Sequence, residues 1–263
     1  MLLAEIHGKY DPSVRDNEDY LTSSVFSHLR YVAPGPFWQE LLSRAMTVAI
    51  NGMEQSLCSI VGDNFVPGVY ERLEVHFWPR AVGLGEPELA ICFTGGKQEP
   101  LVLLVEVKLW SPKSGYGEHD QLMRYLRIAD FIDLLKPAAP PNATAVVLYL
   151  TPRDSLIEVQ DSLEQAGDTD RNRRRLFRLQ WQDMIEAIDA IFLSESLFNQ
   201  QILADVRDFL RVRQLEYFRG FRTPVDVSQL EAGCGSFYSP QGIFDGFQRA
   251  PSLSKVAIVR GEW

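Results

Sequence analysis

Cysteine and histidine are scarce in this sequence of 263 residues, which contains three cysteines and four histidines. Cys58, Cys92 and Cys234 are far apart, and none belongs to a Cys-x-x-Cys or Cys/His pattern. This distribution suggests neither a disulfide framework nor a thiolate zinc site. We therefore expect the protein to work in a reducing, intracellular compartment.

Long apolar runs are also missing. No stretch approaches the roughly 20 apolar residues of a membrane-spanning helix. Glu5, His7 and Lys9 interrupt what would have to be the apolar core of a signal peptide. We expect a cytoplasmic, soluble protein with no membrane partner.

Positive charge is in deficit, because 26 Lys and Arg residues stand against 35 Asp and Glu residues, a formal net charge of −9. This balance is the opposite of the one that binds nucleic acid through bulk charge. The length and the hydrophobic content of 46% are those of a globular protein with one large domain or two small ones.

Hydrophobic periodicity predicts helices interspersed with strands. Helices are expected at 17–31, 37–51, 118–135, 155–166, 182–193 and 197–218, and strands at 70–78, 88–93, 101–110, 143–150 and 175–179. The turn-rich link 94–97 predicts an antiparallel hairpin between the second and third strands. The wholly apolar strand 143–150 belongs in the middle of a sheet. The predicted fold class is α/β, a mixed β-sheet flanked by helices.

Two opposite charges stand near the end of the apolar strand 101–110. Because side chains alternate along a strand, Glu106 and Lys108 project from one face, opposite Val107. One interpretation is a surface ion pair at the point where the strand emerges into solvent, which would contribute little energy. The other is a pair that takes part in chemistry.

Glu88 starts the preceding strand, so across a short hairpin Glu88 and Glu106 can lie on neighbouring strands. Two carboxylates held close repel each other unless a cation lies between them. Ligation by oxygen alone suits Mg²⁺ or Mn²⁺ rather than Zn²⁺. Lys108 beside such a metal would orient an attacking water or stabilise charge that develops on a phosphate.

These residues resemble the signature of the PD-(D/E)XK nuclease superfamily, which has the restriction-endonuclease-like fold. The signature is an acid, usually Asp after Pro, on one core strand, followed on the next strand by Asp or Glu, any residue, and Lys. Pro87-Glu88 and Glu106-Val107-Lys108 match it, with Glu in place of Asp at position 88. The resemblance implies that Glu88, Glu106 and the main-chain carbonyl of Val107 bind the metal.

Gln121 and Tyr125 are four residues apart on the predicted helix 118–135 and therefore project from the same side. Their spacing resembles the Gln-x-x-x-Tyr motif of the branch of the superfamily related to recombination exonucleases. The resemblance implies that both residues place the substrate and order the site. The alternative interpretation is that Tyr125 belongs to the core and Gln121 faces solvent.

Glu18 lies in the first turn of the predicted helix 17–31, on the stripe that should face the sheet. Members of the superfamily often carry a carboxylate on this helix, and the resemblance implies that Glu18 contacts the metal or its waters. The alternative is a favourable interaction with the helix dipole or a capping role. The sequence around Glu18 also resembles defence-associated members, which implies a role against phage.

Five arginines form the one concentrated basic segment, and a solvated face is the usual explanation of such a run. If the chain is a nuclease, the segment would contact phosphates and locally overcome the repulsion expected from the net charge. The candidate nucleic-acid-binding residues are Arg171, Arg173, Arg174 and Arg175.

The sequence therefore favours a Mg²⁺-dependent nuclease that hydrolyses phosphodiester bonds, in DNA rather than RNA. The alternative is a catalytically silent nuclease-fold module that binds DNA or a protein partner. We expect a nuclease-like domain at 1–195 and a C-terminal extension at 196–263, which consists of a helix and an aromatic-rich segment that packs on the domain or on a partner. A homodimer would suit duplex cutting, which needs two strand cleavages.

Overall fold

The computed structural model describes residues 2–9, 16–50, 53–61, 69–96, 98–216, 238–239 and 242–243. The chain divides into two compact units, Met1–Tyr217 and Phe218–Trp263. In the second unit, β7 (Tyr238–Ser239) pairs with β8 (Gly242–Ile243) in antiparallel fashion. The predicted packing of the aromatic side chains beyond Gly220 lies outside the described residues.

A sheet of six strands forms the centre of the first unit, in the order β1-β6-β5-β4-β3-β2. Its strands are β1 (Met46–Thr47), β2 (Arg72–Phe77), β3 (Leu89–Thr94), β4 (Leu101–Val107), β5 (Thr144–Thr151) and β6 (Leu176–Gln180). β4, β5 and β6 run parallel, whereas β2, β3 and β4 form an antiparallel meander and β1 runs antiparallel to β6. The predicted hairpin and the predicted mixed sheet, with 143–150 inside it, are confirmed.

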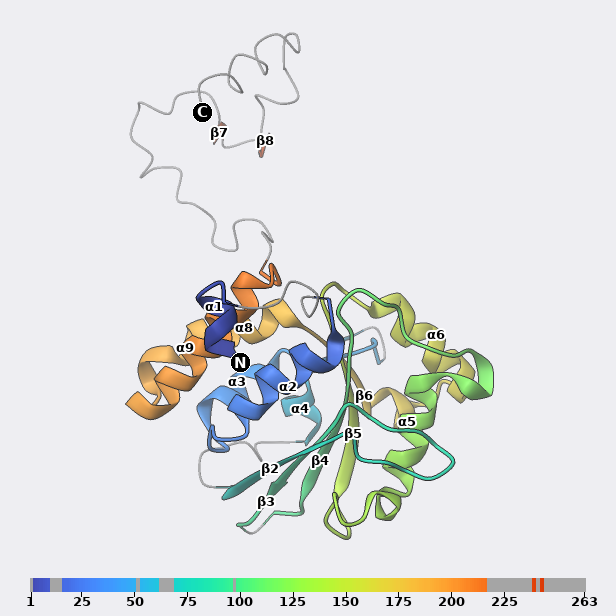
Figure 1. Ribbon diagram of the computed structural model, residues 1–263. Helices are drawn as coiled ribbons and strands as arrows, with labels where there is room; N and C mark the ends of the chain where they lie inside the picture. Colours follow the sequence, from blue (N-terminus) through green and yellow to red (C-terminus); the bar gives the residue numbers. More distant parts are fainter. Residues whose placement is uncertain are drawn as a thin grey trace. The chain divides into compact units, whose positions relative to one another are not determined.

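Helices cover both faces of this sheet (Figure 1). One layer holds α1 (Leu2–Ile6), α2 (Glu18–Leu29), α3 (Pro36–Ser43), α4 (Leu57–Val61), α8 (Trp181–Ile191) and α9 (Leu197–Val212). The other holds α5 (Gln121–Asp130) and α6 (Leu156–Ala166). Shorter turns are η3 (Gly117–His119), η4 (Ile132–Leu135), α7 (Asp170–Arg173) and η5 (Phe192–Ser194). In the described part of the chain, no helix combines the length and the apolarity needed to span a membrane.

The alternation of side chains along β4 divides the core into two clusters. Leu103 and Val105 pack in the cluster that contains α2 and α8, whereas Val102 and Leu104 pack in the cluster that contains α5 and α6. All seven residues of the strand are buried. Glu106 therefore follows Leu104 on the α5 face, at a position that burial would otherwise give to an apolar residue.

Several helices are shorter than the sequence predicts. The predicted helix 37–51 ends at Ser43, because Met46 and Thr47 leave the helical path and pair with β6. Val48 continues the apolar spacing of the predicted helix, but it is buried after the strand and not in a helix. Pairing with a distant strand therefore overrides the local helical pattern here. The predicted helix 118–135 is divided into η3, α5 and η4.

The C-terminal end of α9 is joined to the N-terminal helix by a buried ion pair. Arg213 follows α9 and pairs with Glu5 of α1, and each residue's side chain is 1% exposed. The guanidinium also lies over the rings of Tyr20 and Phe209, at 5.1 and 5.2 Å from their centroids. These contacts make α9 a part of the first unit.

Replacing Arg213 tests this anchor. Arg213→Ala leaves the Glu5 carboxylate buried without its partner, and we expect a loss of about 3–5 kcal/mol in the free energy of unfolding. Arg211→Ala is the matched control: Arg211 pairs with Asp189 and Glu216 at the surface, so its loss should stay below about 1 kcal/mol. Urea denaturation measures both values, and equal losses would contradict a special role for the buried pair.

Candidate active site

The Glu106 carboxylate is the most deeply buried acid of the predicted site. Its side chain is 0% exposed at the end of β4. Oε1 lies 2.7 Å from the ammonium of Lys108, two residues further along the same face. Oε2 lies 3.0 Å from the hydroxyl of Tyr125, which is positioned to donate to it from α5. Sequence alternation on β4 therefore produces a buried ion pair, not a surface pair.

Glu88 reaches the same place from the neighbouring strand. Leu89 pairs with Val105 in the antiparallel register, so one step beyond that pair Glu88 stands opposite Glu106. Trp78, at the end of β2, holds Glu88 in two ways: its backbone N–H donates to the Glu88 carbonyl at 2.9 Å, and its indole Nε1 donates to Oε2 at 2.9 Å. The register therefore makes the two motif positions neighbours on adjacent strands.

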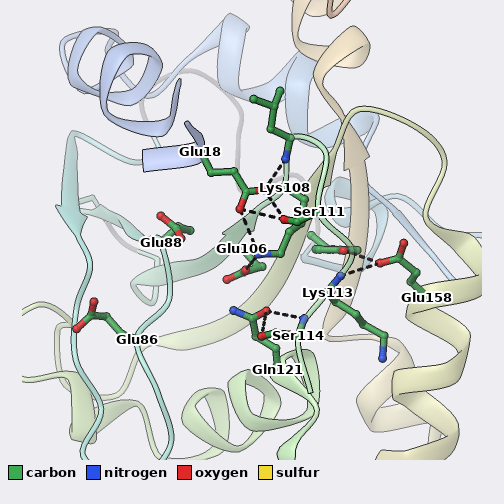
Figure 2. A network of polar contacts seen from close by, with 12 residues as sticks. Glu18, Glu86, Glu88, Glu106, Lys108, Ser111, Lys113, Ser114, Gln121 and Glu158 are labelled. Carbon is green, nitrogen blue, oxygen red and sulfur yellow. Dashed lines mark hydrogen bonds and ion pairs between the residues drawn. The ribbon is translucent and has the colours of Figure 1, made fainter. Parts of the chain in front are cut away.

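Glu18 comes to the site from the first turn of α2 (Figure 2). Its Oε2 accepts hydrogen bonds from the Leu109 N–H at 2.6 Å and from the Ser111 hydroxyl at 3.0 Å, and its Oε1 lies 3.7 Å from the Lys108 ammonium. A capping role belongs instead to Asn17, whose side chain accepts from the backbone of the first turn. The side chain of Glu18 therefore connects α2 with the segment that follows β4.

Gln121 and Tyr125 lie in one chain of hydrogen bonds that ends at Glu106. The Gln121 amide donates to the Tyr125 hydroxyl at 3.0 Å, and its Oε1 accepts from the Ser114 hydroxyl at 2.9 Å. The same tyrosine oxygen lies 3.0 Å from the carbonyl of Glu86. Tyr125 is only 1% exposed, so it serves the core and the polar site at once.

Burial and mutual repulsion govern the protonation of these groups. Burial, followed by the charge of Glu106, raises the pKa of Glu88 to about 7. Burial is also the largest cause that raises the pKa of Glu106. Burial alone would lower the pKa of Lys108, but the carboxylates around it, Glu106 foremost, outweigh burial and raise it. Lys108 is therefore a cation at neutral pH, placed between acids that lack sufficient neutralising charge.

A divalent metal fits the chemistry of this arrangement in part. Across the described ranges, no group of three or more His, Cys, Asp or Glu side chains is placed to hold a metal ion. The predicted ligand set is smaller, with the carboxylates of Glu88 and Glu106 and the main-chain carbonyl of Val107. Oxygen ligands of this kind suit Mg²⁺, and the charge of Glu106 adds to burial in raising the pKa of Glu88.

Sequence reasoning missed the residues that support this site. Trp78 holds Glu88 from a left-handed backbone conformation, φ 49°, that a tryptophan rarely adopts. Lys113 and Asp120 form a buried ion pair that fixes the loop between β4 and α5. The Asp120 carboxylate also accepts a hydrogen bond from the Ser162 hydroxyl at 3.0 Å. Asp120 caps α5 by accepting from the Met123 N–H, and an aspartate just before a helix is the local signal that could have drawn attention to it.

The arginine segment lies at another part of the sheet. Arg171 and Arg175 pair with Asp130, and Arg175 also donates to the Ala145 carbonyl at the start of β5. Glu106, by contrast, lies beside Tyr149 in the strand register, near the other end of β5. A pocket of about 670 Å³ is lined by Arg171, Arg174 and Arg175. Arg173 pairs with Asp168. The structure thus does not bring these four arginines to the carboxylates.

The raised pKa of Glu88 makes a testable difference to stability. Without metal, the folded protein holds this proton up to about pH 7, whereas an unfolded carboxyl loses it near pH 4.5. The free energy of unfolding should therefore fall as the pH rises between these values. Because solvent screens part of this effect, we expect Glu88→Gln to stabilise the protein by only about 1 kcal/mol near pH 8. Near pH 4, where Glu88 is largely protonated in both states, we expect no stabilisation.

Urea denaturation in EDTA at the two pH values measures this effect. Glu86→Gln is the matched control, because Glu86 is an exposed acid two residues away. A stabilisation by Glu88→Gln that is the same at both pH values would contradict the assignment.

Comparisons of the chain with protein-family models, with curated proteins and with solved structures found no significant match. The resemblance of the short motifs to the PD-(D/E)XK superfamily thus stays a prediction. The site described above rests on the geometry of the chain's own residues.

Proposed function

We propose that the chain is a Mg²⁺-dependent nuclease that hydrolyses phosphodiester bonds in DNA. The observation that supports this most directly is that Glu88, just before β3, is a cross-strand neighbour of Glu106 on β4, with the Lys108 ammonium 2.7 Å from Glu106. Two carboxylates and one cation at the end of a hairpin are the groups that metal-assisted phosphoryl chemistry uses.

A divalent ion held by Glu88, Glu106 and the Val107 carbonyl would supply Lewis-acid polarisation and a water of lowered pKa. Every other step belongs to side chains of this protein. Lys108 keeps its proton because carboxylates surround it. It therefore acts through its charge, by orienting a water or by stabilising negative charge that develops on the phosphate, and not as a general base.

The surrounding residues keep these groups in position. Tyr125 holds one oxygen of Glu106, and Gln121 holds Tyr125. Glu18 binds the backbone of Leu109 and lies near Lys108, so it fixes the end of β4 relative to α2. Hydrogen-bonded support of this kind is needed because reacting groups must be held within a few tenths of an ångström.

The net charge of −9 limits how the protein binds DNA. Three acids, Glu18, Glu88 and Glu106, are committed to the site, but the surface as a whole still repels phosphates. We therefore propose weak non-specific affinity, and binding that depends on a guiding partner or on a second copy of the chain. A role in defence against phage is consistent with this dependence.

Cleavage assays with linear duplex, circular and single-stranded DNA and with RNA, in Mg²⁺ and in EDTA, test the proposal. Glu106→Ala and Lys108→Ala should each lower Mg²⁺-dependent cleavage about 100-fold or more. Glu86→Ala changes an exposed acid outside the carboxylate pair, so it should cleave at the wild-type rate. Circular dichroism shows whether each variant is folded.

Undiminished cleavage by both folded variants would refute the assignment of the site. A wild-type protein that cleaves none of these substrates, and whose thermal stability responds to neither Mg²⁺ nor Mn²⁺, would instead indicate a silent module that binds DNA or a protein.

A further inference from the structure

A pocket of about 330 Å³ opens beside Lys108. One wall is the segment after β4 and the other is the segment after β5, and the two strands run parallel. Its lining includes Lys108, Trp110, Ser111, Arg153, Ser155 and Glu158. Ligands of open α/β sheets bind outside the carboxyl ends of parallel strands. The pocket has this location and shares Lys108 with the candidate active site.

Trp110 gives the pocket an aromatic wall that solvent can reach. The residue is 58% exposed, although tryptophan usually lies in a core or an interface. Its indole Nε1 donates to Asp16 at 3.2 Å, so the orientation of the ring is fixed. An exposed and oriented indole is a platform on which an unpaired base can stack.

The opposite wall offers groups that bind an anion. Arg153 is exposed, and the described residues provide it with no ion-pair partner. Ser155 precedes α6, a helix of 11 residues, and its own side chain makes no capping hydrogen bond. Ser155 is 5% exposed, lines the pocket, and its Oγ has no hydrogen-bond partner within the described ranges. The Leu156 N–H donates to Asp154, and the other backbone N–H groups of a helix N-terminus favour a phosphate.

The acids of the pocket each accept hydrogen bonds from neighbouring groups. Asp154 lies 3.2 Å from the guanidinium of Arg178 and accepts a hydrogen bond from the Leu156 N–H. Glu158 accepts from the Tyr149 hydroxyl at 2.6 Å and from the Lys113 N–H at 3.4 Å. Of the two cations that line the pocket, Lys108 is already paired with Glu106 at 2.7 Å, whereas Arg153 has no ion-pair partner in the described part of the chain.

We propose that this pocket, the Trp110 pocket, receives one unpaired nucleotide of the DNA strand that is cleaved. The base stacks on Trp110, and a phosphate next to the scissile one contacts Arg153 and the N-terminus of α6. Because a base within a duplex is covered by its neighbours, the substrate class is single-stranded DNA or an unpaired end. This inference rests on the proposed nuclease function, which places the scissile phosphate beside Lys108.

Binding without cleavage tests the pocket directly. Fluorescence anisotropy of the wild-type chain in EDTA compares a labelled oligodeoxythymidine with a blunt DNA hairpin of equal phosphate number. We expect the single strand to bind about tenfold more tightly than the hairpin, and Trp110→Ala to lower single-strand affinity about tenfold. Trp110→Phe keeps a ring and should restore most of that affinity, whereas hairpin binding should not change.

Two further variants complete the test. Arg153→Ala should weaken single-strand binding several-fold and reduce its salt dependence, which keeps the proposal testable if Trp110→Ala fails to fold. Phe198→Ala is the control, because Phe198 is 61% exposed on α9 and does not line the pocket. It should bind both DNAs as the wild type does.

The outcomes separate this inference from the proposed function. Single-strand affinity that neither Trp110→Ala nor Arg153→Ala changes would overturn the Trp110 pocket, even where cleavage depends on Glu106 and Lys108. Equal binding of hairpin and single strand would overturn it as well. Trp110-dependent binding of single strands without any Mg²⁺-dependent cleavage would support the pocket and refute the nuclease.

Discussion

Burial of the Glu106 carboxylate is the constraint on which the rest of the site depends. A carboxylate that is 0% exposed at the end of an otherwise apolar strand loses the hydration that stabilises its charge. The cost is offset by Lys108 on the same strand and by the Tyr125 hydroxyl on α5. Removing either group would leave a buried charge with incomplete compensation, which is why the surrounding residues are arranged so closely.

Compensation is still incomplete, because a second acid faces the first. Lys108 supplies one positive charge, whereas Glu106, Glu88 and Glu18 supply up to three negative ones around it. Burial is the largest cause of the rise in the pKa of Glu88 to about 7, and the charge of Glu106 adds to it. A cation bound between Glu88 and Glu106 would reduce the repulsion between their carboxylates. The same cation is the one that the proposed chemistry requires.

Alternation and turn chemistry predicted that Glu88 and Glu106 lie on neighbouring strands. The hairpin of β3 and β4 makes Glu88 a cross-strand neighbour of Glu106, and four-residue spacing places Gln121 beside Tyr125. Periodicity carries no information on long-range partners. It therefore did not reveal that Trp78 holds Glu88, or that the parallel strands separate Arg175 from Glu106 along β5. The helix predicted at 37–51 was too long because Met46 and Thr47 form a strand that pairs with β6.

The central claim is that Glu88 and Glu106 together bind a divalent cation. Anomalous diffraction from crystals of the protein grown with Mn²⁺ tests it most directly, because the signal locates the metal without reference to activity. The account predicts one peak within ligand distance, about 2.0–2.3 Å, of oxygens from both carboxylates. Crystals with no peak at this pair, and with Lys108 as the sole cation beside Glu106, would contradict it.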